Sequence, residues 1–247
     1  MKSYDATTKL CGARKCVKKE IEVIRKKLNN LVVEKNEDLL DPEVLKLSEE
    51  LDELIVKYNR THKKDCIINL YNISGIHSTF YYYGENHLFT NMIQYIDHGI
   101  KNKEIIHISM KPELYDKLLK FLSTFEIPQE HIKFYPVKEL ILSNKTGGLD
   151  GLKKKVAVCT KEALEKGYGG IRWIGQPTYA IQETSKDDFL SWEINLTEAL
   201  QNTKVSLICI YDYYDYINDK KVIDERVINE SLNTHSHVLN KFYLENI

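Results

Sequence analysis

The 247-residue sequence lacks long apolar runs, a large net charge and a paired cysteine pattern. No apolar run approaches the ~20 residues that a membrane-spanning helix needs, and the first fifteen residues, MKSYDATTKLCGARK, lack the apolar centre of a signal peptide. We therefore expect a cytosolic protein that does not cross a membrane. The 35 Lys and Arg nearly balance the 36 Asp and Glu, so no overall field favours nucleic acid or an anionic membrane surface.

The cysteines are few and odd in number, which fits reduced thiols rather than a disulfide framework. They lie at Cys11, Cys16, Cys66, Cys159 and Cys209. The CGARKC stretch could hold a metal through Cys11 and Cys16, but no third and fourth ligand lies nearby at zinc spacing. We therefore predict that the chain binds no metal and needs no cofactor of its own.

Two amphipathic helices are predicted near the N-terminus. Residues 16–34 carry an apolar stripe at spacings of three and four: Val17, Ile21, Ile24, Leu28, Leu31 and Val32. After a break, Asp41-Pro42-Glu43 supplies an N-cap, a proline suited to the first helical position and an acidic first turn. The second helix should run to about residue 60. Such a hairpin buries little surface alone, so it should dock on a second copy, the other domain or a partner, and a dimeric four-helix bundle is the simplest closure.

From residue 66 onward, apolar and β-branched runs alternate with helical stretches. The expected strands are CIINLYN, TFYYY, EIIHISM, HIKFYP, GIRWIG, VSLICIYD and a last strand near residue 241. The expected helices cover residues 86–98, 112–125, 149–166, 187–201 and 222–232. This alternation predicts a largely parallel sheet flanked by helices. The chain is thus expected to be a two-domain α+β protein with a helical hairpin first and an α/β domain over residues 66–247.

A carboxylate falls on the apolar side of the second predicted helix. At about 100° per residue, Ser48 and Asp52 lie within the arc drawn by residues such as Leu45, Leu51 and Ile55. An ionised group is costly on a sealed packing face. The arc either has a solvated margin at this point or faces a partner surface. In the second case Arg25, beside the stripe of the first helix, is a candidate partner for Asp52.

These two helices are similar to the small phosphatases named after sporulation stage zero protein E, whose signature is Ser-Gln-Glu-Leu-Asp. The similar stretches are IEVIRKKL and DPEVLKLSEELDELIVKY, and the signature appears as Ser48-Glu49-Glu50-Leu51-Asp52. We assign residues 12–62 to this hairpin. Members of the family remove the phosphoryl group from the aspartyl phosphate of the response regulator that commits endospore-forming bacteria to sporulation. The resemblance implies that Asp52 is the functional carboxylate and Ser48 its helical neighbour.

Such a site needs little covalent chemistry, because phosphoryl transfer depends mainly on positioning and electrostatics. Asp52 would accept a hydrogen from the attacking water, while the regulator's own Mg²⁺ and lysine offset the repulsion between carboxylate and phosphoryl group. Glu49 replaces the family's Gln and cannot donate a hydrogen bond. Its place at the edge of the arc predicts modest attenuation. Regulator binding is expected to involve Arg25, Leu45, Leu51 and Ile55.

The larger domain is similar to the MEDS sensory domain of the dichloromethane-responsive regulator DcmR, which is proposed to descend from RecA/KaiC-like ATPases. The similar stretches are GIHSTFYYYGEN, FTNMIQYIDHGIKNKEIIHIS, GGIRWIGQPTY, LICIYDYYDY and THSHVL. No GxxxxGK[ST] phosphate loop is present. The resemblance implies a RecA/KaiC-like parallel sheet that senses a small molecule, such as a simple hydrocarbon derivative, and does not hydrolyse nucleotides.

Ligands of open α/β sheets bind beyond the carboxyl ends of the strands. Gln176 after IRWIG and Asp212 after LICIY should fall there and are the first binding candidates. His77 lies in a predicted loop and is a further candidate. Cys209 is a buried filler or a reporter thiol, and Arg172 within a strand needs an acidic partner, either a ligand or a core side chain. The tyrosines of residues 81–83 and 211–214 are interpreted mainly as sheet-face and flanking aromatics.

Three functions remain open from the sequence. The first is a ligand-modulated aspartyl-phosphate phosphatase that acts on a sporulation response regulator as a homodimer. The second is a non-catalytic protein whose hairpin only sequesters its regulator or dimerises, because Glu49 has removed activity. The third is a surviving RecA-like NTPase in the larger domain. Turnover of a phosphorylated regulator separates the first two, and nucleotide binding tests the third.

Overall fold

The computed structural model describes residues 20–35, 41–65, 67–218 and 221–246, with residues 56–65 as backbone only. It divides into two compact units, Met1–Cys66 and Ile67–Ile247. Cys11, Cys16 and Cys66 lie outside the described residues, as does the start of the first predicted helix. No helix in the described part of the chain is both long enough and apolar enough to cross a membrane.

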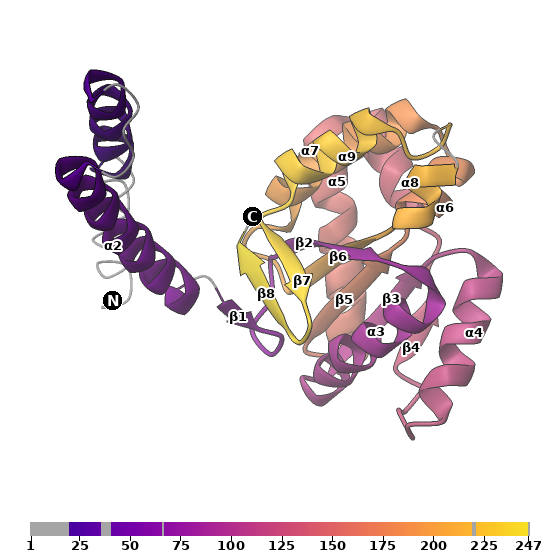
Figure 1. Ribbon diagram of the computed structural model, residues 1–247. Coiled ribbons are helices and arrows are strands. Elements are labelled where there is room, and N and C mark those ends of the chain that lie inside the picture. Colours follow the sequence, from indigo (N-terminus) through magenta and orange to yellow (C-terminus); the bar gives the residue numbers. More distant parts are fainter. Residues whose placement is uncertain (1–19, 36–40, 66, 219–220, 247) are drawn as a thin grey trace. The chain divides into compact units, whose positions relative to one another are not determined.

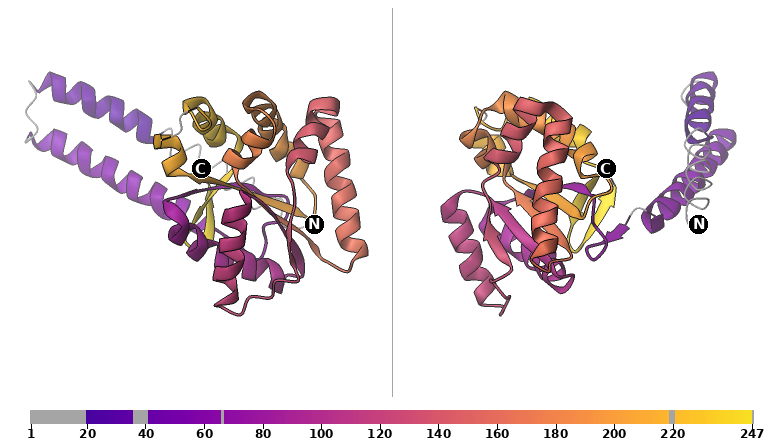
Figure 2. Two further views of the ribbon diagram at one scale, coloured as in Figure 1. Left: turned by 90° about the vertical axis from the view of Figure 1, so that its right-hand side faces the viewer. Right: turned by 180° about the vertical axis from the view of Figure 1, so that it is seen from behind.

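The N-terminal unit is a pair of helices that lie side by side, as the apolar stripes predict (Figures 1 and 2). They cover residues 20–34 and α2 (Pro42–Asp65). The predicted cap of α2 is confirmed, because a side-chain oxygen of Asp41 accepts a hydrogen bond of 2.8 Å from the backbone N–H of Glu43. Lys35 adds a salt bridge of 2.6 Å to Glu43. The end of the first helix is thereby tied to the start of the second.

The C-terminal unit is a mixed eight-stranded sheet with helices on both faces (Figures 1 and 2). Its strands are β1 (Ile67–Asn69), β2 (His77–Tyr82), β3 (Glu104–Ser109), β4 (Ile132–Phe134), β5 (Gly170–Gly175), β6 (Val205–Asp212), β7 (His237–Asn240) and β8 (Tyr243–Asn246). Its helices are α3 (Gly84–Lys101), α4 (Pro112–Ser123), α5 (Lys138–Glu165), α6 (Pro177–Glu183), α7 (Lys186–Leu200), α8 (Tyr213–Asn218) and α9 (Glu225–Thr234).

Two hydrophobic cores lie on the two faces of this sheet. Buried residues of α3 and α4 form one core with side chains of β2, β3, β5 and β6, including Ile106, Ile174 and Ile208. Buried residues of α5, α6, α7 and α9 form the other, around Trp173 and Leu207. The central strands β5 and β6 are therefore covered on both faces, which explains their nearly continuous apolar sequences.

The expectation of a parallel sheet needs one correction. The strand order is β1-β8-β7-β2-β6-β5-β3-β4, and β8 runs antiparallel to both β7 and β1 while the other pairings are parallel. The single strand expected near residue 241 is in fact two strands. Lys241 has a φ of 55°, a left-handed conformation that reverses the chain between them. The sheet is therefore mixed at this edge.

Most other elements agree with the apolar pattern, with local exceptions. Strands β5 and β6 match GIRWIG and VSLICIYD residue for residue. Helix α5 begins eleven residues earlier than the expected helix at 149, and the two parts meet at Gly148, whose φ of 56° and ψ of −148° are not helical. His77 is the first residue of β2, so its predicted place in a loop is wrong. The short helices α6 and α8 were not expected.

Candidate functional site

The hairpin presents its signature on an accessible margin of α2. Asp52 and Glu49 are exposed, Ser48 is half-buried, and Ser48 and Asp52 lie one helical turn apart. Val44 marks the packed centre of the arc, with 3% of its surface exposed. Asp52 therefore lies at the edge of the packed stripe and is open to an approaching molecule.

Apolar side chains flank this carboxylate at different depths. Leu51 and Ile55 are half-buried, whereas Leu45 keeps 46% of its surface exposed. On the helix Leu45 falls beside Asp52, about 20° away at 100° per residue. The carboxylate thus has an exposed hydrophobic neighbour, a combination that suits contact with a protein surface.

The predicted ion pair between Arg25 and Asp52 is not what the structure shows. Nη1 of Arg25 lies 3.2 Å from Oε1 of Glu22, one turn away on the same helix, and both side chains are exposed. An i, i+3 pair needs no ordering across the hairpin, which explains its preference. Within the described residues Asp52 has no ion pair or side-chain hydrogen bond.

The sequence leaves two alternative partners for Arg172, a ligand or an acidic side chain of the core. In the structure the partner is an acidic side chain. Its Nε donates to Oε2 of Glu104 at 2.7 Å, and Nη2 lies 2.6 Å from the same oxygen. Nη1 and Nη2 also donate to the carbonyl oxygens of Tyr95 and Leu70. The fully buried guanidinium is thereby held by protein oxygens, and it lines neither of the two pockets described below.

Gln176 and Asp212 lie at the carboxyl edge of the sheet, where the strand pattern places them. Gln176 is buried, accepts a hydrogen bond from the backbone of Lys111 at 3.0 Å and donates to the hydroxyl of Tyr82 at 3.3 Å. Both residues line a polar pocket of about 210 Å³, with Tyr82, Glu85, Lys111, Glu113, Leu114, Lys117 and Asp215. Burial raises the pKa of Asp212, although a hydrogen bond from the Tyr214 amide opposes the shift.

A second pocket lies at the same edge and is mostly aromatic. This tyrosine pocket, of about 350 Å³, is lined by Tyr81, Tyr83, Tyr211, Asp212, Tyr213, Tyr216 and Ile228. Its rings lie in pairs, with centroids 5.4 Å apart for Tyr81 and Tyr211 and 5.0 Å apart for Tyr83 and Tyr213. The interpretation of these tyrosines mainly as flanking aromatics is therefore incomplete. Pockets of this size and lining hold small, largely apolar molecules.

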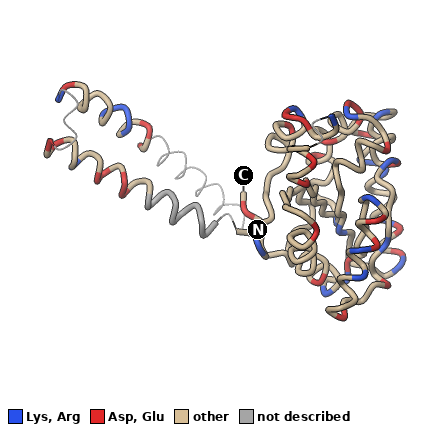
Figure 3. The backbone as a smooth tube through the Cα atoms, turned by 45° about the vertical axis from the view of Figure 1, so that its right-hand side comes forward, with Lys and Arg blue, Asp and Glu red and all other residues tan. Residues whose placement is uncertain are grey.

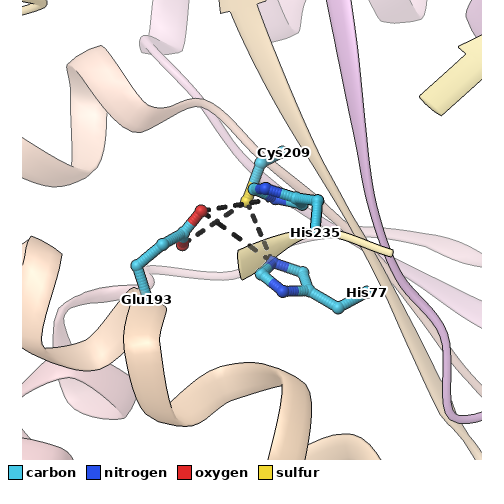
Figure 4. A group of neighbouring side chains, drawn as sticks. All are labelled: His77, Glu193, Cys209 and His235. Carbon is cyan, nitrogen blue, oxygen red and sulfur yellow. Dashed lines mark hydrogen bonds and ion pairs between the residues drawn. The ribbon is translucent and has the colours of Figure 1, made fainter. Parts of the chain in front are cut away.

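His77 and Cys209, predicted separately, meet in a buried cluster with Glu193 and His235. Figure 4 shows the four side chains pointing toward one another. They come from β2, β6, α7 and the end of α9. Nε2 of His77 lies 3.6 Å from Sγ of Cys209, and Oε1 of Glu193 lies 3.3 Å from Nε2 of His235. We call these four residues the buried cluster.

Burial holds the buried cluster in its uncharged forms. It raises the pKa of Glu193 to about 8, against hydrogen bonds from Tyr211 and Cys209 that lower it. It also lowers the pKa of His77 well below its usual value, with His235 adding to the shift, and lowers that of His235 to about 4. The pKa of the Cys209 thiol is raised well above its usual range by burial and the nearby Glu193. The four groups therefore avoid net charge without a cation.

Glu193 and His235 were not among the residues predicted from the sequence, although the sequence does contain a signal for Glu193. On the wheel of α7, Glu193 falls inside the buried apolar arc, with Leu190 about 60° to one side and Leu200 about 20° to the other. A carboxylate on the apolar side of a helix is the same signal that drew attention to Asp52. His235 lies in the THSHVL stretch quoted for the sensory domain, but no pattern distinguished it from its neighbours.

Comparisons with known proteins agree with both resemblances. A family model described as "Spo0E like sporulation regulatory protein" matches residues 17–60, and the model of "MEDS: MEthanogen/methylotroph, DcmR Sensory domain" matches residues 76–236. A search of curated proteins found no significant match. Among solved structures, an uncharacterized protein from Pyrococcus horikoshii, in complex with an unknown peptide, is similar at 9% identity and a TM-score of 0.45. That similarity covers 66% of this chain and 76% of the other.

The two family models lie in the order that the sequence predicts, with the sporulation-regulator match over the hairpin and the sensory match over the mixed sheet. The MEDS match covers more than half of the chain. The chain belongs to the MEDS sensory-domain family and carries a Spo0E-like sporulation regulatory domain ahead of it.

Proposed function

We propose that the hairpin dephosphorylates the aspartyl phosphate of a sporulation response regulator and that the sensory domain adjusts this activity when it binds a small molecule. The observation that carries the proposal is the exposed Asp52 on a signature-bearing face whose apolar neighbours remain partly uncovered. The match to sporulation regulatory proteins supports it, because that family is known for this activity. The second unit adds the sensory role.

The role of Asp52 is to orient a water molecule in line with the phosphorus–oxygen bond. An aspartyl phosphate is already activated, so a positioned hydrogen-bond acceptor contributes on the order of a few kcal/mol, typical of positioning effects. Water attacks phosphorus, the bond to the regulator's carboxylate breaks, and inorganic phosphate leaves. The hairpin contributes no metal to this step, and the regulator's own Mg²⁺ balances the phosphoryl charge.

The charge on α2 favours a partner whose site carries cations. Over residues 42–55 the helix carries five acidic side chains, Glu43, Glu49, Glu50, Asp52 and Glu53, and one basic side chain, Lys46. Figure 3 shows the acidic positions repeating along this helix. A negative face repels a bare phosphoryl group and is attracted to a site containing Mg²⁺ and lysine. Association should therefore weaken as salt increases.

The proposal is tested by turnover. Substoichiometric full-length protein is mixed with phosphorylated regulator, and released phosphate is followed over many equivalents. Asp52→Asn should nearly abolish release while retaining regulator binding, because an amide keeps the shape but is a poorer acceptor for the water proton. Glu53→Gln is the matched control, since Glu53 is also exposed on α2 but lies about 100° further round the helix. Full turnover by Asp52→Asn would end the catalytic assignment.

A non-catalytic hairpin is the second candidate, and Glu49 is the observation that favours it. Glu49 is exposed where the family signature has Gln, so an additional negative charge stands near Asp52. If sequestration is the function, the amount of phosphate released should not exceed the amount of phosphorylated regulator that the protein binds. In the catalytic case Glu49→Gln should leave the rate equal or higher, because it removes that charge. A large loss of rate in Glu49→Gln would contradict this account of the signature.

The tyrosine pocket is the proposed site for the sensed molecule. Its lining is aromatic with one carboxylate, Asp212, which suits a small apolar compound with a single polar handle. A thermal-shift screen of the full chain with simple hydrocarbon derivatives tests this. Tyr213→Ala should remove any shift, while Tyr71→Ala, an exposed tyrosine outside the pocket, should keep it. A shift that survives Tyr213→Ala would place the ligand elsewhere.

A RecA/KaiC-like ancestry without nucleotide hydrolysis is part of the same proposal. Tyr83 alone connects β2 to α3, and Gly84 and Glu85 form the start of the helix. An acidic side chain at a helix N-terminus competes with phosphate for the same N–H groups. We expect no ATP or GTP binding at millimolar concentration. Hydrolysis that follows the purified chain through every column would support the NTPase reading instead.

A homodimer through the hairpins is the proposed assembly. Val23 and Val33 keep 51% and 73% of their surfaces exposed, so the first helix leaves apolar area uncovered. Light scattering at several concentrations should give a mass of two chains that falls to one after Val33→Asp. A monomer at every concentration would leave this surface to the regulator.

A further inference from the structure

We infer that the buried cluster of His77, Glu193, Cys209 and His235 is a binding site for a divalent transition-metal cation of the Zn²⁺ class. The four residues offer two imidazole nitrogens, a sulfur and a carboxylate, and these ligand atoms lie within 4.8 Å of one another. All four residues are buried. The inference replaces, for the C-terminal unit, the expectation that the chain binds no metal, and it stands independently of the hairpin's catalysis.

Hydrogen bonds fix both histidines in the tautomer that a metal requires. Nδ1 of His235 lies 2.7 Å from the carbonyl oxygen of Ser231, which can only accept, so Nδ1 carries the proton. Oγ1 of Thr197 donates to the carbonyl of Thr234 at 2.6 Å and therefore accepts from Nδ1 of His77 at 2.9 Å. Each Nε2 is left with a lone pair, and metal-bound histidines are oriented in this way.

The centre of the cluster holds a buried nitrogen that has no hydrogen-bond partner. Nε2 of His235 makes no hydrogen bond although it is buried, and the nearest acidic atom is Oε1 of Glu193 at 3.3 Å. The donors that reach the centre are the Tyr211 hydroxyl, 3.2 Å from Oε1 of Glu193, and the Cys209 thiol, 3.8 Å from Oε2. In the metal-free cluster the Glu193 carboxyl and the Cys209 thiol hold protons, while each imidazole Nε2 offers a lone pair. A divalent cation that displaces these two protons gains four ligand atoms at once.

The spacing of the ligand atoms fits tetrahedral coordination. Metal–nitrogen bonds of about 2.0 Å and metal–sulfur bonds of about 2.3 Å put ligand atoms about 3.3–3.6 Å apart around a tetrahedral ion. The observed separations are 3.3 Å between Glu193 and His235, 3.6 Å between His77 and Cys209, and 4.0 Å between His77 and Glu193. The remaining pairs lie within 4.8 Å, so the side chains close the site around an ion by moving inward by up to about an ångström.

Charge and ligand type select the class of metal. A thiolate and a carboxylate neutralise a divalent ion, so the loaded site carries no net charge into the interior. Imidazole and thiolate suit Zn²⁺ and similar borderline ions, whereas Mg²⁺ and Ca²⁺ prefer oxygen ligands. A thiolate ligand also distinguishes this site from one formed by two histidines alone, because only the thiolate gives a sulfur-to-metal charge-transfer band. We therefore assign it to Zn²⁺ or a cation of the same class.

The site also lies one hydrogen bond away from the tyrosine pocket. Tyr211, a pocket residue, donates to Glu193, and the hydroxyl of Tyr81, another, lies 3.0 Å from Oγ of Ser231, whose carbonyl oxygen accepts from His235. A metal that holds Glu193 and His235 in place therefore also restrains the pocket residues Tyr211 and Tyr81. Metal loading is expected to stabilise the C-terminal unit because it ties α7 and the end of α9 to β2 and β6.

The test uses the full chain carrying Cys11→Ser, Cys16→Ser and Cys66→Ser, which leaves Cys159 and Cys209 as its thiols. The apoprotein, prepared with a chelator, is titrated with Zn²⁺ and separately with Co²⁺. We expect about one equivalent to bind, with the absorption of tetrahedral Co²⁺ and a sulfur-to-cobalt charge-transfer band, and a higher melting temperature. Uptake below about a tenth of an equivalent, with no thermal shift, would overturn the assignment and leave the cluster a hydrogen-bonded core.

Variants then locate the site. Cys209→Ser should remove the charge-transfer band, and Cys159→Ser, which changes the other buried thiol, should keep it. Thr197→Val removes the partner of His77 Nδ1 without touching a ligand and should weaken binding roughly 10- to 100-fold, the usual effect of losing such a support. Circular dichroism checks that each variant folds. A band that survives Cys209→Ser, or a Thr197→Val affinity equal to that of the parent, would overturn the proposal.

Discussion

Replacing Arg172 by Met should strongly destabilise the C-terminal unit without involving any ligand. The guanidinium is fully buried, pairs with Glu104, and donates to the carbonyl oxygens of Tyr95 and Leu70. Met fills much of the same volume, so the main loss is electrostatic. Removing one partner of a buried ion pair costs about 3–5 kcal/mol, because the other charge is left uncompensated. For a domain of this size that is roughly a 6–20 °C fall in melting temperature.

A double-mutant cycle separates the energy of the Arg172–Glu104 ion pair from the cost of leaving the two carbonyl oxygens without a donor. Burial raises the pKa of Glu104, although Arg172 opposes the shift, so removing Arg172 should push Glu104 towards its neutral form. Glu104→Gln supplies a neutral side chain of the same shape. The double variant Arg172→Met/Glu104→Gln should therefore be more stable than Arg172→Met alone, with a coupling energy of roughly 1–3 kcal/mol. Both carbonyls remain unpaired in either case and cancel from the comparison.

The measurement is chemical denaturation monitored by circular dichroism on the full chain, with melting curves as a second readout. A loss below about 1 kcal/mol for Arg172→Met would refute the reasoning, since an exposed pair behaves in that way. Additive effects in the cycle would also refute it. If Arg172 instead contacts the sensed molecule, its replacement should change the ligand's affinity while leaving the stability of the free protein nearly unchanged.

Three further predictions follow from single sites. Gly99→Ala should destabilise by about 1–3 kcal/mol in denaturation, although this change in a helix usually stabilises, because the new Cβ would lie 2.6 Å from Cδ1 of Ile106. Asp224→Ala should cost about 1 kcal/mol at neutral pH by removing the cap of α9. Although burial raises the pKa of Asp224, hydrogen bonds from Lys186 and the helix N-terminus lower it overall, so the difference between wild type and variant should be full above about pH 4 and vanish as pH falls through the folded value. Leu45→Ala should weaken regulator binding roughly 10-fold, as truncation of an interface anchor does, without changing the melting temperature.

The fold was readable from the sequence where an element is long or fully covered. Strands β5 and β6 lie between two helical layers, so their apolar runs are uninterrupted and their bounds follow directly. The β7–β8 hairpin was missed because each strand has four residues and the turn at Lys241 uses no glycine. The short helices α6 and α8 were missed for the same reason, because one or two turns carry too few residues to show a period.

The buried cluster was only half readable. His77 and Cys209 were named, yet they are separated by 132 residues and meet because β2 and β6 are neighbours in the sheet. Strand order is decided by crossovers and packing, which a single sequence does not reveal. His235 joins them only after α9 returns the chain to β7, beside β2. The residue types can be read from the sequence, but their proximity depends on the order of the strands in the sheet.

One rule, that a carboxylate on an apolar arc needs a reason, applies to two places in this chain, and the surroundings decide its meaning. Helix α2 belongs to a two-helix unit, so Asp52 at the edge of its arc stays exposed and a protein surface can reach it. Helix α7 packs against α5, α9 and the sheet, so Glu193 inside its arc is sealed, with none of its surface exposed. Besides the hydrogen bonds from Tyr211 and Cys209, only a proton or a bare ion can neutralise a carboxylate there. The same departure from the apolar pattern therefore predicts a macromolecular partner at Asp52 and a cation at Glu193.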